Sequence, residues 1–93
     1  MREKDIEHTL VTAVKRCGGA AVKFISPGFD GMPDRIVLLH EGKLGFVEVK
    51  APGKHTRPLQ TVRHRMLQKL GFKVYVIDST EQIEGVINDI RAT

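Results

Sequence analysis

The fold is most constrained by the stretch from residue 31 to residue 54, GMPDRIVLLHEGKLGFVEVKAPGK, in which two apolar segments flank a short polar connection. The segments RIVLL and LGFVEVK have the composition of strands, and the connection, 41–43, contains a glycine and has the length of a hairpin turn. We therefore predict an antiparallel hairpin. Its second strand carries Glu48 and Lys50 at alternate positions among apolar residues, where a charged side chain needs a partner.

The faces of this hairpin decide which charged side chains meet. Side chains of a strand alternate between two faces, so Glu48 and Lys50 share one face. A three-residue turn at 41–43 would pair Asp34 with Lys50 and Ile36 with Glu48, which brings Asp34 to the same face. An even-length turn would send Asp34 to the other face. An arrangement of all three charged residues on one face therefore requires an odd turn or a bulge.

Hydrophobic spacing predicts three helices and two further strands around the hairpin. The expected helices begin near residues 3, 58 and 80, and the expected strands are 20–26 and 72–77. The resulting order is α-β-β-β-α-β-α, which is typical of an α/β fold with a mixed sheet flanked by helices. A chain of 93 residues can form one such domain, 1–93, but not two.

All three helices show apolar periodicity, and in the first, 3–17, the recurring residues are Ile6, Leu10, Ala13, Val14 and Cys17. In the second helix the recurring residues are Leu59, Val62, Met66 and Leu70, and Gly71 ends the helix. Before the last helix, Ser79 and Gln82 have the spacing of a capping box. The residues of that helix expected to face inward are Ile83, Val86, Ile87 and Ile90.

The charge distribution favours a polyanionic partner. The net charge is +4, and no acidic residue lies between Glu48 and Asp78. The basic residues within that interval are Lys50, Lys54, His55, Arg57, Arg63, His64, Arg65, Lys69 and Lys73. Such clustering is typical of nucleic-acid binding, although a solvated helix face is an equally ordinary explanation for a charge run taken alone.

The composition is that of a soluble protein. No apolar run approaches the roughly 20 residues of a membrane span, and the N-terminal MREKDIEH lacks the features of a secretory signal. The single cysteine, Cys17, has no partner for an intrachain disulfide. We expect a cytoplasmic protein without a membrane partner.

Two carboxylates beside a lysine have a clear chemical use. Asp34 and Glu48 can hold a divalent cation through oxygen, and such a cation polarises a phosphodiester and lowers the pKa of an attacking water. The ammonium of Lys50 can stabilise the charge that develops on the phosphate or orient the water. Alternatively, Asp34 and Lys50 form a plain cross-strand ion pair on a surface hairpin.

The pattern resembles a known family. Pro33-Asp34, followed after fourteen positions by Glu48-Val49-Lys50, is similar to the PD-(D/E)XK nuclease motif. Glu7 in the first helix, the GMPD of residues 31–34 and Gln60 in the second helix resemble the VRR-NUC branch, the virus-type replication-repair nucleases. The resemblance covers essentially the whole chain and implies a restriction-endonuclease-like core.

This resemblance implies roles for individual residues. Asp34, Glu48 and the main-chain carbonyl of Val49 would bind Mg²⁺ or Mn²⁺, with Glu7 approaching directly or through a water. Lys50 would be the catalytic lysine, and Gln60 would hydrogen-bond near it or near the water.

The expected substrate is DNA. The segment APGKHTRP, 51–58, follows the strand that carries Lys50 and mixes glycine, proline and basic residues, so we predict that it contacts phosphates. The expected DNA contacts are Lys54, His55, Arg57 and Arg63. Aromatic residues make up only 5% of the chain, which favours duplex over single-stranded DNA.

The resemblance suggests a phage or bacterial DNA-repair enzyme that cuts branched DNA such as four-way (Holliday) junctions. Two symmetric cuts by a chain with one active site need two copies, so we predict a homodimer. Two alternatives remain open. One is a non-catalytic nucleic-acid-binding module with the same fold. The other is a nuclease of the same superfamily with another DNA substrate, as in restriction enzymes, or with RNA.

Overall fold

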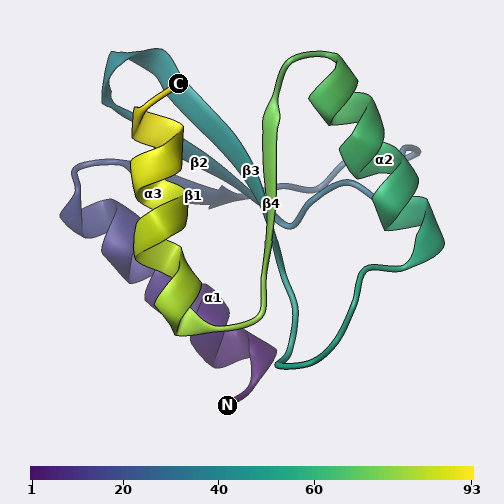
Figure 1. Ribbon diagram of the computed structural model, residues 1–93, viewed down its shortest axis with the longest axis horizontal. Helices are drawn as coiled ribbons and strands as arrows, with labels where there is room; N and C mark the ends of the chain where they lie inside the picture. Colours follow the sequence, from purple (N-terminus) through teal and green to yellow (C-terminus); the bar gives the residue numbers. More distant parts are fainter.

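The computed structural model describes residues 1–93 and contains three α-helices around a four-stranded sheet (Figure 1). In chain order the elements are α1 (Glu3–Arg16), β1 (Ala20–Lys23), β2 (Arg35–Leu39), η1 (His40–Gly42), β3 (Lys43–Val49), α2 (Pro58–Lys69), β4 (Lys73–Ile77), η2 (Thr80–Gln82) and α3 (Ile83–Arg91), where η marks a 3₁₀ turn. This order confirms the predicted α-β-β-β-α-β-α arrangement and the mixed α/β class. The first strand is shorter than predicted, because it ends at Lys23 rather than at residue 26.

The strands lie in the order β1-β2-β3-β4. β1 pairs antiparallel with β2, and β2 with β3, whereas β4 pairs in parallel with β3. A parallel pair needs a crossover connection, and α2 provides it. β1 and β4 are therefore the two edges of the sheet.

One face of the sheet forms the hydrophobic core. Figure 1 shows α1 and α3 together on this side of the strands and α2 alone on the other. The core residues are Ile6, Leu10 and Val14 of α1, Ile83, Val86, Ile87 and Ile90 of α3, and Ala21, Val37, Val47, Val49 and Ile77 of the sheet. Gly45 permits the close approach of α3, because a Cβ atom there would lie 2.6 Å from Cδ1 of Ile90.

The last helix agrees with its sequence pattern. Ser79 accepts a hydrogen bond from the backbone N–H of Glu81, and the side-chain oxygen of Gln82 accepts from the backbone of Ser79. The predicted capping box is therefore present, and it opens η2 directly before α3. The four residues expected to face inward are all buried.

The hairpin register differs by two residues from the predicted one. Its turn has three residues, an odd number as required, but they are His40–Gly42 rather than 41–43. Ile36 therefore pairs with Phe46 and not with Glu48. A left-handed backbone at Glu41 (φ 66°), which a non-glycine residue seldom adopts, closes the turn early. Because the shift is even, every side chain keeps its predicted face.

The apolar stripe of α2 does not face the core. Leu59, Val62 and Leu70 are 45%, 54% and 67% exposed, whereas His64 and Leu67 are the buried residues of this helix. An apolar stripe at helical spacing usually faces inward, so α2 is turned relative to its sequence pattern. The inward positions are used instead by side chains that reach the charged end of β3.

No helix is both long enough and apolar enough to cross a membrane.

Candidate active site

The charged residues of the hairpin lie on the α2 side of the sheet. Glu48 occupies the last part of β3, and its side chain is buried (1% exposed). Asp34 directly precedes β2 and accepts a hydrogen bond from the backbone N–H of Val49 at 3.0 Å. This bond ties the residue before one strand to the end of the other. Asp34, Glu48 and Lys50 therefore come together, as the hairpin faces predicted.

Gln60 of α2 links the lysine to the glutamate. Lys50 Nζ donates to Gln60 Oε1 at 2.8 Å, and Gln60 Nε2 donates to Glu48 Oε2 at 3.0 Å. Lys50 Nζ itself lies 3.4 Å from the same Glu48 oxygen. The Gln60 oxygen also accepts from the backbone N–H of Arg57, which fixes the side chain at the start of α2. The ammonium group is thus held in one place rather than free to move in solvent.

The environment of Glu48 disfavours its negative charge. Burial, and after it the neighbouring charge of Asp34, raise the pKa of Glu48 from 4.5 to about 7, although Lys50 acts in the opposite direction. Such an environment favours a proton or a cation at the carboxylate. Perturbed carboxyl groups of this kind are common at functional sites.

His64 also belongs to this site, although the sequence did not single it out. It is 7% exposed, and its Nε2 lies 3.8 Å from Oε1 of Glu48. Burial, followed by the charge of Lys50, lowers the pKa of His64 below its usual value. Its spacing of four residues from Gln60 is the signal that could have found it, because such residues share a helix face.

Glu7 lies on the other side of the sheet from Glu48. Its carboxylate accepts a hydrogen bond from Arg35 Nε at 3.0 Å, and Arg35 also donates to the backbone oxygen of Ala21. Neither Asp34 nor Glu48 is among its hydrogen-bond partners. The role of Glu7 toward a metal ion stays a prediction.

The residues predicted to contact DNA have two different settings. Lys54, His55 and Arg57 are exposed in the connection between β3 and α2. Arg63 is half-buried, donates from Nε to the backbone oxygen of Asp30 at 2.8 Å and lies 4.0 Å above the ring of Phe29. Arg63 therefore holds the loop that leads to Asp34, a role that the sequence did not indicate.

The available metal donors are few and are oxygen atoms. No three side chains of His, Cys, Asp or Glu are arranged so that they could hold a metal ion together. Two carboxylates remain, Asp34 and Glu48, together with main-chain oxygens at the end of β3. The mutual repulsion of these carboxylates fits a hard divalent cation, which oxygen ligands bind well.

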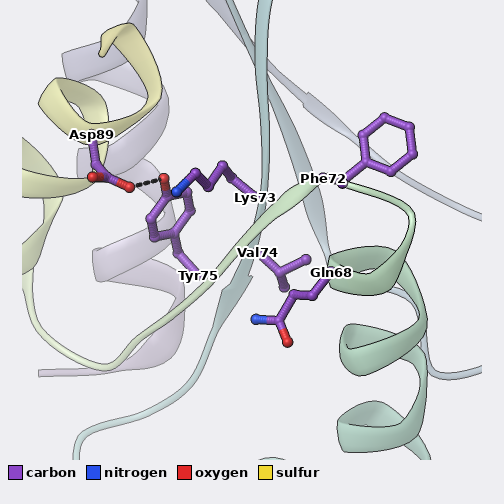
Figure 2. Close-up of a pocket in the computed structure, with 7 residues that line it drawn as sticks. Gln68, Phe72, Lys73, Val74, Tyr75 and Asp89 are labelled. Carbon is purple, nitrogen blue, oxygen red and sulfur yellow. Dashed lines mark hydrogen bonds between the residues drawn. The ribbon is translucent and has the colours of Figure 1, made fainter. Parts of the chain in front are cut away.

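The hollow shown in Figure 2 is lined by neither Asp34 nor Glu48. It has a volume of about 470 Å³ and lies along the chain from Phe72 into the first residues of β4, Lys73 to Tyr75. The Tyr75 hydroxyl donates to the carboxylate of Asp89, and burial together with this carboxylate raises the pKa of Tyr75. None of the predicted site residues lines this hollow.

Comparisons with known proteins identify relatives of the whole chain. No protein-family model matches the chain. The chain is 49% identical over 81 residues to "Putative nuclease p44" of Acyrthosiphon pisum secondary endosymbiont phage 1, with 87% of each protein covered. A solved structure described as a VRR_NUC domain superposes with a TM-score of 0.86 at 27% identity, covering 95% of this chain and 97% of the other.

Proposed function

Because this chain belongs to the VRR-NUC family of nucleases, we propose that it hydrolyses DNA phosphodiester bonds with the help of Mg²⁺ or Mn²⁺. The observation that carries this proposal is the buried carboxylate of Glu48 beside Asp34, with a pKa raised to about 7. A pair of acids in this position destabilises its own ionised form. A bound divalent cation removes that penalty.

Asp34, Glu48 and the main-chain carbonyl of Val49 are the residues that would hold the cation, with Glu7 contributing through a water. The bound ion would polarise the phosphate and lower the pKa of the attacking water. The hydrogen bond from the Val49 N–H orients Asp34 before any ligand arrives. This preorganisation reduces the rearrangement that binding requires.

Lys50 would act on the substrate directly. Its ammonium is fixed by Gln60 and sits beside Glu48, so it can stabilise negative charge on the phosphate in the transition state or orient the water. Gln60 acts through Lys50 and Glu48 and not on the substrate. Both roles follow from the same chain of hydrogen bonds.

DNA would approach along the exposed connection between β3 and α2. Lys54, His55 and Arg57 lie there without acidic neighbours in sequence, next to the residues that would perform the chemistry. Contacts of this kind position a duplex through its phosphates and carry no base sequence. We therefore propose shape-selective cutting of branched DNA, such as a four-way junction, in a bacterial cell or a phage-infected host.

A second copy of the chain would complete the enzyme. Val62 and Leu70 leave the apolar stripe of α2 exposed, and β4 is an open sheet edge beside it. Ile77 O accepts from Lys50 N, so the backbone groups of Ile77 point toward β3. Backbone groups alternate in direction along a strand, so those of Val74 and Val76 point to the open side of β4. Antiparallel pairing of two β4 strands about a two-fold axis would place the two α2 stripes side by side.

Light scattering tests this dimer. The wild type is expected to have the mass of two chains, and Val62→Glu, which puts a charge in the α2 stripe, the mass of one. Lys4→Ala, an exposed change on α1, is the matched control and should leave the mass unchanged. A monomeric wild type would contradict the dimer but leave the chemistry untouched.

Cleavage assays test the proposed activity. A labelled four-way junction and a matched linear duplex are incubated with Mn²⁺, Mg²⁺ or EDTA, using the wild type and Lys50→Ala. We expect metal-dependent cutting of the junction by the wild type only. Equal cutting of both DNAs would reject the branch preference. Binding that persists in EDTA without any cutting would instead identify a non-catalytic module, and cutting of the matching RNA alone would identify an RNA-directed nuclease.

A further inference from the structure

Two buried side-chain atoms in the chain have no hydrogen-bond partner, and they face each other. They are Oε1 of Glu48 and Nε2 of His64, which are 3.8 Å apart. A hydrogen bond between such atoms is about 2.7–3.2 Å long, so the distance between these two atoms exceeds the upper end of that range by about 0.6 Å. Buried polar atoms are almost always paired, and an exception calls for an explanation.

The position of His64 on α2 relates it to Gln60. Gln60 donates to Oε2 of Glu48, and His64, four residues later on the same helix, faces Oε1. One helix face therefore addresses both oxygens of a single carboxylate. No other side chain of the described chain donates a hydrogen bond to Oε1.

We propose that His64 is a positioning residue for Glu48: the imidazole donates its Nε2–H to Oε1 when the carboxylate turns to bind the cation, and so fixes the orientation of this ligand. The inference rests on the proposed function, because it concerns the metal-binding state of Glu48. Nδ1 of the ring is not one of the buried atoms without a hydrogen-bond partner, so it is the nitrogen that can remain unprotonated. Partners that orient a ligating carboxylate affect metal affinity strongly.

The same contact could instead make His64 a metal ligand through a lone pair on Nε2. Two arguments oppose this. An unprotonated Nε2 would set one acceptor against another in a buried place, which is unfavourable without a metal. Hard cations such as Mg²⁺ also prefer oxygen to imidazole nitrogen. A neutral imidazole with its proton on Nε2 can instead donate to Oε1 of Glu48, which gives both buried atoms a hydrogen-bond partner.

Mn²⁺ binding, followed by the electron paramagnetic resonance signal of the free ion, tests the proposal with two substitutions at one position. His64→Gln keeps an N–H near the place of Nε2, whereas His64→Leu fills the space without a donor. We expect His64→Leu to weaken Mn²⁺ binding about 10- to 100-fold and His64→Gln to stay close to the wild type. His8→Leu, at an exposed position of α1, is the control, and circular dichroism verifies that each variant is folded.

The outcomes separate the readings. Wild-type affinity in a folded His64→Leu variant overturns the proposal, and an equal loss in both variants identifies a direct ligand and overturns it as well. The nitrogen resonances of His64, recorded without metal, provide an independent test: a protonated Nε2 is expected, and an unprotonated Nε2 contradicts the inference. Absence of Mn²⁺ binding by the wild type would overturn the metal proposal, while the nitrogen resonances would still decide the state of His64.

Discussion

The two faces of the sheet differ in the side chains that they bury. On the α1 and α3 side, the buried side chains are apolar and form one continuous cluster. On the α2 side, Glu48 of β3 and His64 of α2 are buried, while the apolar Val62 of α2 and Leu70 at its end are exposed. The first arrangement buries apolar side chains only, whereas the second buries charged and polar groups beside the apolar Phe46 and Leu67. The comparison indicates that one face stabilises the domain and the other is shaped by its chemistry.

Natural proteins keep energetically unfavourable groups where function requires them. The two faces should therefore respond differently to substitution. Substitutions on the core face should change the stability of the domain. Substitutions of the charged groups on the α2 face should change activity and should leave stability unchanged or improve it.

The largest effect is expected for Lys50→Ala. Removing the ammonium that stabilises transition-state charge should lower the cleavage rate by about 10²–10³-fold or more at saturating Mn²⁺. The urea unfolding midpoint should change little, because the ammonium makes its hydrogen bond and its ion pair with Gln60 and Glu48 and none with the core face. Lys4→Ala serves as a control with full activity. A rate within a few-fold of the wild type would remove Lys50 from the mechanism.

The core face is tested by Ile77→Ala. Ile77 is 1% exposed and lies in the apolar cluster, so this change should lower the free energy of unfolding by about 2–5 kcal/mol. Val62→Ala, a similar truncation on the exposed stripe of α2, should lower it by about 0.5 kcal/mol or less in urea denaturation of the dilute protein. Similar losses for the two variants would contradict the contrast between the faces.

The stability of the metal-free protein should depend on pH through Glu48. Its pKa is about 7 in the folded state, against 4.5 as the ordinary value. Between these two pH values the folded state holds a proton that the unfolded chain has released. The stabilisation that results is full below pH 4.5 and is lost as the pH rises through about 7. His64, whose pKa is lowered, acts oppositely, since its contribution is lost as the pH falls. The difference between the wild type and Glu48→Gln in urea titrations isolates the effect of Glu48, and a pH-independent difference would contradict it.

The smallest effect is expected for Lys54→Ala. This exposed residue is proposed to contact a phosphate, so its loss should weaken DNA binding a few-fold, equally for all sequences, and reduce the salt dependence by about one counterion. Lys23→Ala, an exposed change on β1, is the matched control. Fluorescence anisotropy at several salt concentrations would measure both. An unchanged salt slope would move the DNA away from this connection.

Much of this architecture could be predicted because local patterns and global packing agree. The alternation in LGFVEVK correctly indicated the faces of β3, the capping box at Ser79 indicated where the last helical segment opens, and apolar spacing indicated the inward side of α3. The grouping of Asp34, Glu48 and Lys50 followed from strand periodicity, since an even register shift leaves faces unchanged. These features depend on neighbours close in sequence.

The rest depended on contacts between distant segments. The apolar stripe of α2 could not reveal that its opposite side faces Glu48, because tertiary contacts decided how the helix is turned. Likewise, the pairing of Glu7 with Arg35 and the hold of Arg63 on the loop at Asp30 join residues far apart in the chain. His64 was missed for the same reason: its meaning comes from the carboxylate that it faces.

The most direct test of the account is the free energy of unfolding of the wild type and Glu48→Gln at pH 8, with and without Mn²⁺. Without metal, Glu48→Gln should be the more stable protein, because it removes a buried charge beside Asp34. With Mn²⁺ the order should reverse, since only the wild type gains stability from the ion. If Mn²⁺ leaves the wild type unchanged, or stabilises both proteins equally, the charged face is not a metal site built around Glu48.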